Sequence, residues 1–472
     1  MATVKIDKFG GIAPRQHPTQ LADGMAVTAH NVKLKTGKLV PLRQPSLMTG
    51  ASLIFGEGIN TVSQSQSIHV WRDRNGKFDF LLFGGMTWVA EGNIADDERA
   101  RIVVSGDRDG DGRIDEPVLY LRDAASRSHI VHPICKKKLS APKVSRATNS
   151  APLDDNRRYT RFFITWVDRF GYESPVSAPS LAQTEGGNYA DEDLEYMDGD
   201  TISFEPITDL PDEYDSIRVY KIITGTEEGR IQFIKEFGES ENLQKHGFAV
   251  KVKDENAGEI IPEIESPPED LHCISAVPGD FYCGFSKQNP RSVMFSDVGL
   301  LYSWPISYRY DVKHNLVALA VSGNSVFALT DSFAYVLSGT APESMTVTEL
   351  AGSAACVSSK GVCVYRNAVY YVSHAGLMVI HSASSSGIAS ENLTDKIFTK
   401  EQWQDFNPAS CVMGQFDGTL FLFFRKMNGD HLGLSIDLLE NASVAVTTHD
   451  EVAKCLCVDN TTDDMYFIRV ED

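Results

Sequence analysis

An aspartate-rich stretch between residues 106 and 116 holds the most specific pattern of metal-ligating residue types in the chain. It reads GDRDGDGRIDE, with Asp107, Asp109 and Asp111 at alternate positions ahead of Gly112. In calcium loops, alternate carboxylates converge on the cation and a glycine allows the sharp turn. Ile114 has the place of the apolar residue that anchors such a loop. The stretch therefore matches the first nine positions of a D-x-D-x-D-G-x-I-x calcium loop.

The predicted calcium ligands are five carboxylates and one main-chain carbonyl, from Asp107, Asp109, Asp111, Asp115, Glu116 and Arg113. The twelfth position is Val118 and not the bidentate glutamate of an EF-hand, and Pro117 blocks a following helix. The bidentate ligand is therefore missing, or Asp115 or Glu116 replaces it. We expect a bound calcium to brace the loop and not to catalyse. The alternative is an acidic surface turn without metal.

Patterns that indicate an enzyme are weak. The chain has no G-x-S-x-G, P-loop, H-E-x-x-H or dinucleotide fingerprint, and its histidines are scattered. A glycosidase would need a pair of carboxylates, for which the candidates are Asp311, Asp331, Asp417 and Asp437. Each of them sits where a turn is expected, which is common for aspartate. We therefore predict that the chain is not an enzyme and needs no cofactor besides calcium.

Composition limits the partners. The 472 residues carry a formal charge of −20, from 64 acidic and 44 basic residues, which argues against an electrostatic grip on nucleic acid. We expect no signal peptide and no membrane segment, because no apolar run reaches the required length. The run Lys136–Lys138 predicts a solvated loop. Trp304, Tyr308 and Tyr310 are expected in a core between blades.

A repeat of short strands organises much of the chain. Residues 316–338 read as three strands joined by tight polar turns, and similar units recur on both sides. Aligned on the middle strand, the anchors are Phe281, Val326, Val369, Leu420 and Tyr466. Successive anchors are 45, 43, 51 and 46 residues apart, a period typical of β-propeller blades.

The fold class that we predict is all-β, a β-propeller with an inserted β-sandwich of fibronectin or immunoglobulin type. The predicted divisions are an N-terminal arm (1–50), the N-terminal part of the propeller (51–140), the inserted sandwich (141–266) and the C-terminal blades (267–472). The arm is expected to hold a short helix within 21–32 and a hairpin over 34–42. In the insertion, residues 185–200 read as an acidic loop.

Ring closure is expected to involve the N-terminal part. Residues 67–90 read as one three-stranded meander, a sixth propeller-like unit, and the last repeat stops after about two strands. An unpaired sheet edge is a liability, so we predict that strands from 50–105 share a blade with the strands around residues 455–470.

Several segments, taken in order, resemble virion proteins of tailed bacteriophages, in particular the tail tubular or nozzle proteins of short-tailed phages. The resemblance begins with FGGIAPR and HNVKLKTGKLVPLRQP near the N-terminus. It continues through RARIVVSGD, TWVDRFGYESPVSAPS, IRVYKIITG, PPEDLHCISAVPGDFYCGFS, SWPISYRY, residues 315–345, ACVSSKGVCV and IFTKEQWQDFNP. It covers most of the chain, and the aspartate-rich stretch is a departure from it.

The resemblance implies a homohexamer around a channel, at the distal end of a short phage tail. It implies contacts with a tail adaptor ring and with tail fibres or tip proteins. The channel would retain the genome and conduct its DNA during ejection without sequence-specific binding. The expected location is the virion tail, assembled in the cytoplasm of the bacterial host. The alternative from a different class is a propeller that binds, or depolymerises, glycans of the host surface.

Overall fold

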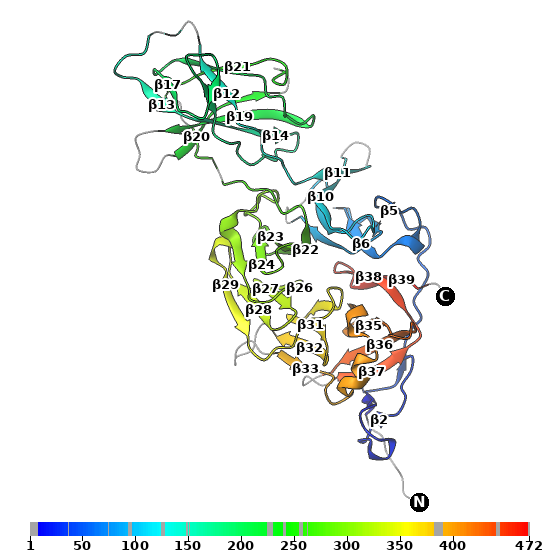
Figure 1. The fold of residues 1–472 in the computed structure, drawn as a ribbon. Helices are drawn as coiled ribbons and strands as arrows, with labels where there is room; N and C mark the ends of the chain where they lie inside the picture. Colours follow the sequence, from blue (N-terminus) through cyan, green and yellow to red (C-terminus); the bar gives the residue numbers. More distant parts are fainter. Residues whose placement is uncertain are drawn as a thin grey trace, which may run out of the picture. The chain divides into compact units, whose positions relative to one another are not determined.

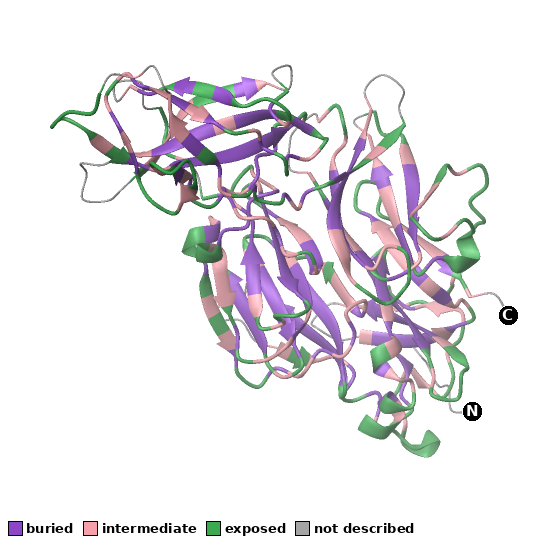
Figure 2. Ribbon diagram, turned by 45° about the horizontal axis from the view of Figure 1, so that its top comes forward, coloured by how far each residue is buried: buried purple, intermediate pink, exposed green. Residues whose placement is uncertain are grey.

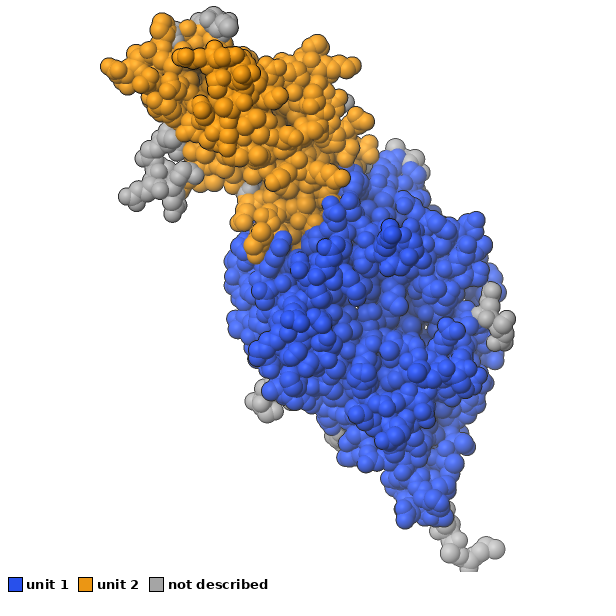
Figure 3. All heavy atoms as spheres, viewed as in Figure 1, with its two compact units in different colours: residues 1–133, 268–299, 307–472 blue, residues 134–267, 300–306 orange. Residues whose placement is uncertain are grey.

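The structure is a computed structural model that describes residues 8–35, 37–73, 75–92, 97–123, 128–147, 150, 152–223, 230–238, 242–253, 258–261, 263–381, 390–439 and 444–470. The described residues form β-strands, five short 3₁₀ turns and one short α-helix, α1 (Lys400–Gln404). The chain divides into two compact units (Figure 3). Unit 1 comprises residues 1–133, 268–299 and 307–472, and unit 2 comprises residues 134–267 and 300–306.

Unit 1 is a β-propeller, in which seven small sheets of the described residues follow one another around a ring (Figure 1). We number these sheets as blades in chain order. Blade 1 is formed by β6 (Ser67–Arg72), β7 (Phe78–Phe83) and β5 (Leu53–Phe55). Blade 2 is formed by β8 (Thr87–Glu91), β9 (Ile102–Gly106), β10 (Asp115–Arg122) and β11 (His129–Pro133). Blade 3 is formed by β22 (Leu271–Val277), β23 (Phe281–Ser286), β24 (Ser292–Phe295) and β25 (Arg309–Asp311).

Blade 4 is formed by β26 (Leu316–Ser322), β27 (Ser325–Thr330), β28 (Ala334–Ser338) and β29 (Thr346–Leu350). Blade 5 is formed by β30 (Val362–Tyr365), β31 (Ala368–Ser373), β32 (Gly376–His381) and β33 (Ser390–Asn392). Blade 6 is β34 (Val412–Phe416), β35 (Thr419–Arg425), β36 (His431–Leu438) and β37 (Val444–His449), extended by β1 (Gly11–Ile12) and β2 (Met25–Ala26). Blade 7 is β38 (Ala453–Asp459) and β39 (Asp464–Arg469).

In blades 1 to 6 the second strand is buried on both faces, whereas β39 of blade 7 is mostly half-buried or exposed. Figure 2 shows buried strands throughout much of unit 1. Because successive side chains of a strand point to opposite faces, alternate residues of β27 enter two different cores. Val326 packs between blades 3 and 4, whereas Phe327 packs between blades 4 and 5. Leu420 and Phe421 of β35 divide in the same way. These strands therefore read as continuous apolar runs, and the five predicted anchors do lie in second strands.

The ring closes where blade 7 meets blade 1. Ile68 and Phe80 share a core with Cys455 and Ile468, and Arg72 forms an ion pair with Asp459. The prediction of a shared blade is wrong, because β38 and β39 pair only with each other among the described strands. The meander over 67–90 is also divided, since β8 begins blade 2. Packing of whole faces closes the ring without a common hydrogen-bonded sheet.

The N-terminal segment covers the outer edge of blade 6. Strand β1 pairs in parallel with β37, with Gly11 opposite Val446. Gly11 has φ of +87°, and a Cβ atom there would lie 2.4 Å from the Val446 carbonyl oxygen, so only glycine fits. The helix predicted within 21–32 is not present, because that stretch holds β2. The predicted hairpin forms between β3 (Val32–Lys33) and β4 (Val40–Pro41).

Unit 2 is a β-sandwich. One sheet holds β12 (Lys143–Arg146), β15 (Leu181–Gln183), β16 (Tyr189–Ala190), β18 (Thr201–Phe204) and β21 (Phe248–Lys251). The opposite sheet holds β14 (Phe162–Asp168), β19 (Tyr214–Ile223) and β20 (Arg230–Gly238). Strands β13 (Arg158–Thr160) and β17 (Leu194–Tyr196) form a two-stranded pair. Side chains such as Ile202 and Ile217 meet in one core between the two larger sheets.

One local expectation is wrong, and two others hold only in part, since Lys137 and Lys138 are exposed and Tyr308 and Tyr310 do lie against a core between blades. The stretch 185–200 contains β16 and β17 and is therefore not a simple loop. Lys136 is buried, with its ammonium 2.6 Å from the Asp168 carboxylate, because an opposite charge offsets the cost of burial. Trp304 belongs to unit 2, where its main-chain N–H donates to the Glu265 carbonyl, whereas Tyr308 and Tyr310 pack against the core of blades 3 and 4.

The five 3₁₀ turns are η1 (Pro18–Gln20), η2 (Val62–Gln64), η5 (Ile306–Tyr308), η6 (Pro342–Ser344) and η7 (Pro408–Ser410). Proline begins η1, η6 and η7, where its missing N–H costs no hydrogen bond. A capping box formed by Thr399 and Gln402 starts α1. The buried Trp403 of α1 then packs into the core between blades 5 and 6.

Candidate functional site

The aspartate-rich stretch is the loop between β9 and β10 of blade 2. Carboxylate oxygens of Asp107, Asp109 and Asp115 all lie within 4.8 Å of one another. The loop is held by its own main chain, since Asp107 accepts hydrogen bonds from the N–H groups of Gly110 (2.7 Å) and Gly112 (3.1 Å). The main-chain N–H of Arg108 donates to Asp115 at 2.6 Å. The fold thus brings together three of the predicted ligand residues.

Glycines allow the loop to lie close to the neighbouring turn of blade 1. A Cβ atom at Gly84 would lie 2.3 Å from the Asp109 carbonyl oxygen, and one at Gly85 would lie 2.2 Å from the Asp107 carboxyl carbon. Gly110 in turn has φ of +88° and faces the Gly84 main chain. The approach therefore depends on glycine on both sides, and the loop is fixed against the β7–β8 connection.

Asp111 and Glu116 are not part of this group of side chains. Asp111 is exposed and caps its own turn by accepting the N–H of Arg113 at 2.7 Å. The Arg113 guanidinium lies 4.0 Å from the same carboxylate. Glu116 lies in β10, outside the group of converging carboxylates. The three grouped residues still suit calcium, because ligand oxygens on opposite sides of a calcium ion are about 5 Å apart.

The electrostatics of the group also suit a cation. Burial, together with the neighbouring charges of Asp109 and Asp115, raises the pKa of the Asp107 carboxyl, although two main-chain hydrogen bonds oppose the shift. Three carboxylates this close repel one another when ionised. A divalent cation between them would offset this repulsion, and the residues would then brace the loop as ligands.

The candidate glycosidase carboxylates each have hydrogen-bond or ion-pair partners within the fold. Asp311 accepts from Ser292 in blade 3, and Asp331 accepts from the Asn315 side chain at 2.9 Å in blade 4. Asp417 pairs with Lys35 at 3.0 Å. Asp437 accepts from the Leu34 main-chain N–H and the Thr419 hydroxyl, both at 2.5 Å. Each carboxylate is engaged in its own blade or with the N-terminal segment, and so serves the fold.

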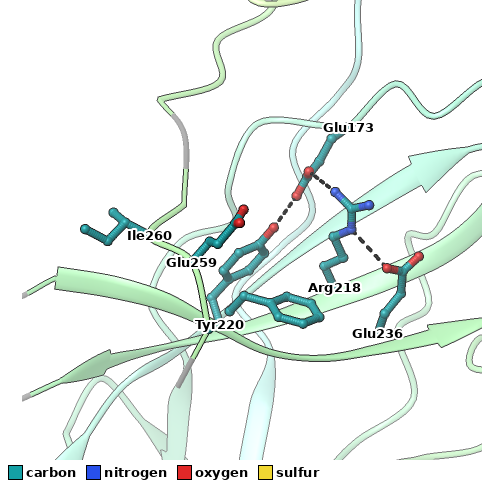
Figure 4. A pocket seen from close by; sticks show the side chains of 8 residues that line it. Glu173, Arg218, Tyr220, Glu236, Glu259 and Ile260 are labelled. Atoms are coloured by element: carbon teal, nitrogen blue, oxygen red, sulfur yellow. Dashed lines mark hydrogen bonds and ion pairs between the residues drawn. The ribbon is translucent and has the colours of Figure 1, made fainter. Parts of the chain in front are cut away.

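Unit 2 contains a polar cavity that the sequence does not indicate, with a volume of about 490 Å³ (Figure 4). Arg218 of β19 lies between two carboxylates, 2.6 Å from Glu173 and 3.2 Å from Glu236. The Tyr220 hydroxyl donates to Glu173 at 2.5 Å, and burial raises the pKa of Tyr220. Glu259 and Ile260 form the other wall. The charged side chains that line the cavity pair with one another, so they primarily form a structural network.

Comparisons with known proteins identify no family. No protein-family profile matches the chain, and no curated protein matches it. Among solved structures, the N-terminal domain of Nup159 is 8% identical with a TM-score of 0.28, over 54% of this chain and 59% of that chain. Apo AztD from Citrobacter koseri is 11% identical with a TM-score of 0.29, over 66% of this chain and 77% of that chain. A puromycin-hydrolysing peptidase of Mycobacterium tuberculosis is 9% identical with a TM-score of 0.26, over 84% and 55%. Similarities at this level bear on no function.

The described helices include none that is both long and apolar enough to span a membrane.

Proposed function

We propose that the chain is a structural component of a bacteriophage tail, and specifically the nozzle at the distal end of a short tail. The observation that carries this proposal is the position in the fold of the two N-terminal segments that resemble phage tail proteins. FGGIAPR supplies β1 and the glycine that approaches Val446, and HNVKLKTGKLVPLRQP supplies the β3–β4 hairpin. Residues that distinguish the resemblance thus cover the edge of blade 6 within the chain, and this supports a structural role for them.

Two further features support a structural role. Alternate side chains of a strand enter the cores on its two sides, so a blade packs against both of its neighbours. A rigid ring in a tail requires such packing. Each described carboxylate considered for glycoside cleavage has a partner within the fold. In the proposed assembly, six copies surround a channel, with an adaptor ring on one side and fibres or tip proteins as other partners. The acidic chain lets DNA pass without holding it.

The oligomeric state of the purified full-length chain tests this proposal. Native mass spectrometry and negative-stain imaging are expected to show rings of six copies, each with a chain mass of 52.0 kDa, either alone or after addition of the adaptor ring. A chain that stays monomeric at high concentration, with and without the adaptor, would contradict the nozzle assignment.

We also propose that Asp107, Asp109 and Asp115 hold a structural calcium ion. Chelation is expected to increase hydrogen exchange of residues 105–118 and to leave the rest of unit 1 protected, because the loop is a local connection. The matched control is Asp111→Asn, which removes a carboxylate outside the converging group. Elemental analysis that finds no calcium in protein purified with millimolar calcium would rule out this site.

A further inference from the structure

Lys360 extends across the ring of unit 1. It precedes β30 of blade 5, yet its ammonium donates a hydrogen bond to the Thr87 carbonyl of blade 2 at 2.5 Å. The same nitrogen lies 4.2 Å from the centroid of the Trp88 ring. Blades 2 and 5 are separated by two blades on one side and three on the other, so the side chain spans the region between the innermost strands. Both Lys360 and Trp88 are partly exposed, so solvent reaches them.

Two histidines and two thiols near this ammonium are neutral at pH 7, and a second lysine, Lys287, also acts on His272 and Cys273. Burial lowers the pKa of His69 in blade 1 and of His272 in blade 3 to about 3. Burial raises the pKa of the Cys273 and Cys455 thiols to about 12. No carboxylate of a described residue forms an ion pair with Lys360. A cation in such surroundings lacks the counter-charge that usually accompanies it.

His272 provides a second and independent observation. Its side chain is buried, with 6% of the residue exposed, and its ring centroid lies 4.1 Å from that of Trp88. Its Nδ1 atom has no hydrogen-bond partner. A buried polar atom without a partner is uncommon in folded proteins and calls for an explanation such as a missing ligand.

The strand beside His272 is distorted. The pairing of β22 with β23 shifts between His272 and Ser275, which is a β-bulge. Cys273 has φ of +54°, a conformation that favours glycine and is strained for a residue with a side chain. Bulges of this kind redirect side chains and are enriched next to binding sites. The distortion lies directly after His272, whose ring contacts Trp88.

We propose that Lys360 and His272, with Trp88 between neighbouring blades, form a binding site for a small oxyanion, either a carboxylate or a phosphate. The ammonium supplies the charge, and an imidazole N–H of neutral His272 supplies a directional hydrogen bond. His69, which hydrogen-bonds the Thr87 hydroxyl at 3.0 Å, completes the neutral wall. The net negative charge of the chain disfavours polyanions. This inference does not depend on the proposed tail function.

The test titrates the full-length chain with sodium phosphate and, separately, with sodium acetate, in a buffer free of other oxyanions. Calorimetry and thermal unfolding are recorded for wild type, Lys360→Met and Lys313→Met. Lys313 is the matched control, because it is an exposed lysine paired with Glu349 at 2.8 Å. We expect saturable binding in wild type and in Lys313→Met, and a loss of affinity of roughly tenfold or more in Lys360→Met. His272→Phe is expected to weaken binding as well.

Acetate represents the carboxylates and phosphate represents the phosphates. The anion that binds wild type with the lower Kd identifies the class that the site prefers. A Lys360 that serves only as a brace between blades would give a different result. In that case Lys360→Met would unfold at a lower temperature, but added anion would raise the unfolding temperature of wild type and variant equally. That outcome, or the absence of saturable binding of either anion to wild type, would overturn the proposal.

Discussion

Single residues in this protein carry chemistry that their sequence neighbours do not reveal. Lys360 stands in the run SSKGVCV, which reads as an ordinary turn before a strand. Only the ring places its ammonium against Thr87 and Trp88, which are 273 and 272 positions away in the chain. The aspartate-rich loop is the opposite case, because its carboxylates are neighbours in the sequence. Asp107, Asp109 and Asp115 converge, whereas Asp111 and Glu116, which the spacing also suggests, do not.

The protonation of Lys360 should make the free energy of unfolding depend on pH. Burial lowers the pKa of its ammonium from 10.5 to about 8 in the folded chain. Between these two values the unfolded chain binds more protons, so the free energy of unfolding rises with pH across this window. We expect wild type to gain about 1–2 kcal/mol over Lys360→Met between pH 7.5 and 10, less than the full shift because the side chain is partly exposed.

Urea unfolding of both proteins at several pH values, without added anions, measures this difference. His69 and His272 remain neutral throughout the window and therefore contribute nothing to the difference. A constant difference between wild type and variant over the whole range would contradict the assignment of a depressed pKa to Lys360.

Glu173 should be the residue on which unit 2 depends most. It is 3% exposed and accepts hydrogen bonds from Thr165 and Tyr220, both at 2.5 Å, besides its ion pair with Arg218. Glu173→Gln replaces one carboxylate oxygen, an acceptor, by an amide NH2 group, a donor. It also removes the negative charge that pairs with the Arg218 guanidinium. We expect the free energy of unfolding of unit 2 to fall by about 2–4 kcal/mol. Glu259→Gln, an exposed wall residue of the same cavity, is the control and should change it little.

At the scale of elements, the alternation of side chains explains both the successes and the errors of sequence analysis. Middle strands such as β27 and β35 are recognisable because both faces are buried. The N-terminal strands are not, because β1 and β2 have only two residues each and depend on hydrogen bonds to β37. The meander over 67–90 was not separable into two blades, because the chain passes from β7 to β8 through a tight Gly84–Gly85 turn that looks like a hairpin.

Replacement of Gly11 tests the edge cover of blade 6. Gly11→Ala combines an unfavourable φ with a close contact to Val446, and we expect a loss of about 2 kcal/mol or more, with faster proteolysis of the N-terminal segment. Gly50→Ala is the matched control, because Gly50 also has positive φ, at +73°, but has no atom within 4 Å of its added Cβ. It should lose only about 1 kcal/mol. Equal losses in the two variants would show that the contact with β37 contributes little.

At the scale of the whole chain, the boundaries of unit 2 decide whether it can be removed. The predicted insertion, 141–266, lies within residues 134–267, but unit 2 also includes residues 300–306. Tyr302 packs on Tyr172 with ring centroids 5.0 Å apart, and Trp304 is 1% exposed. Sequence analysis did not assign residues 300–306 to unit 2, because a segment of seven residues carries no periodic pattern of its own.

Deletion of residues 134–267 with a short Gly/Ser linker should leave a cooperative propeller, provided that Tyr302 and Trp304 are replaced by serine. The same deletion with both aromatic residues retained should aggregate, because it exposes their rings. Calorimetry and size-exclusion chromatography compare the two proteins. Loss of cooperative unfolding in both would show that unit 1 does not fold without unit 2.

The most direct test of the proposed tail function is the location of the chain in virions that carry its gene. Purified particles are labelled with gold-conjugated antibodies against the full-length chain and imaged by negative stain, with non-immune antibodies as the control. The account predicts label at the distal end of the tail, and co-purification of the chain with particles through a density gradient. Particles that contain no copy of the chain would contradict it.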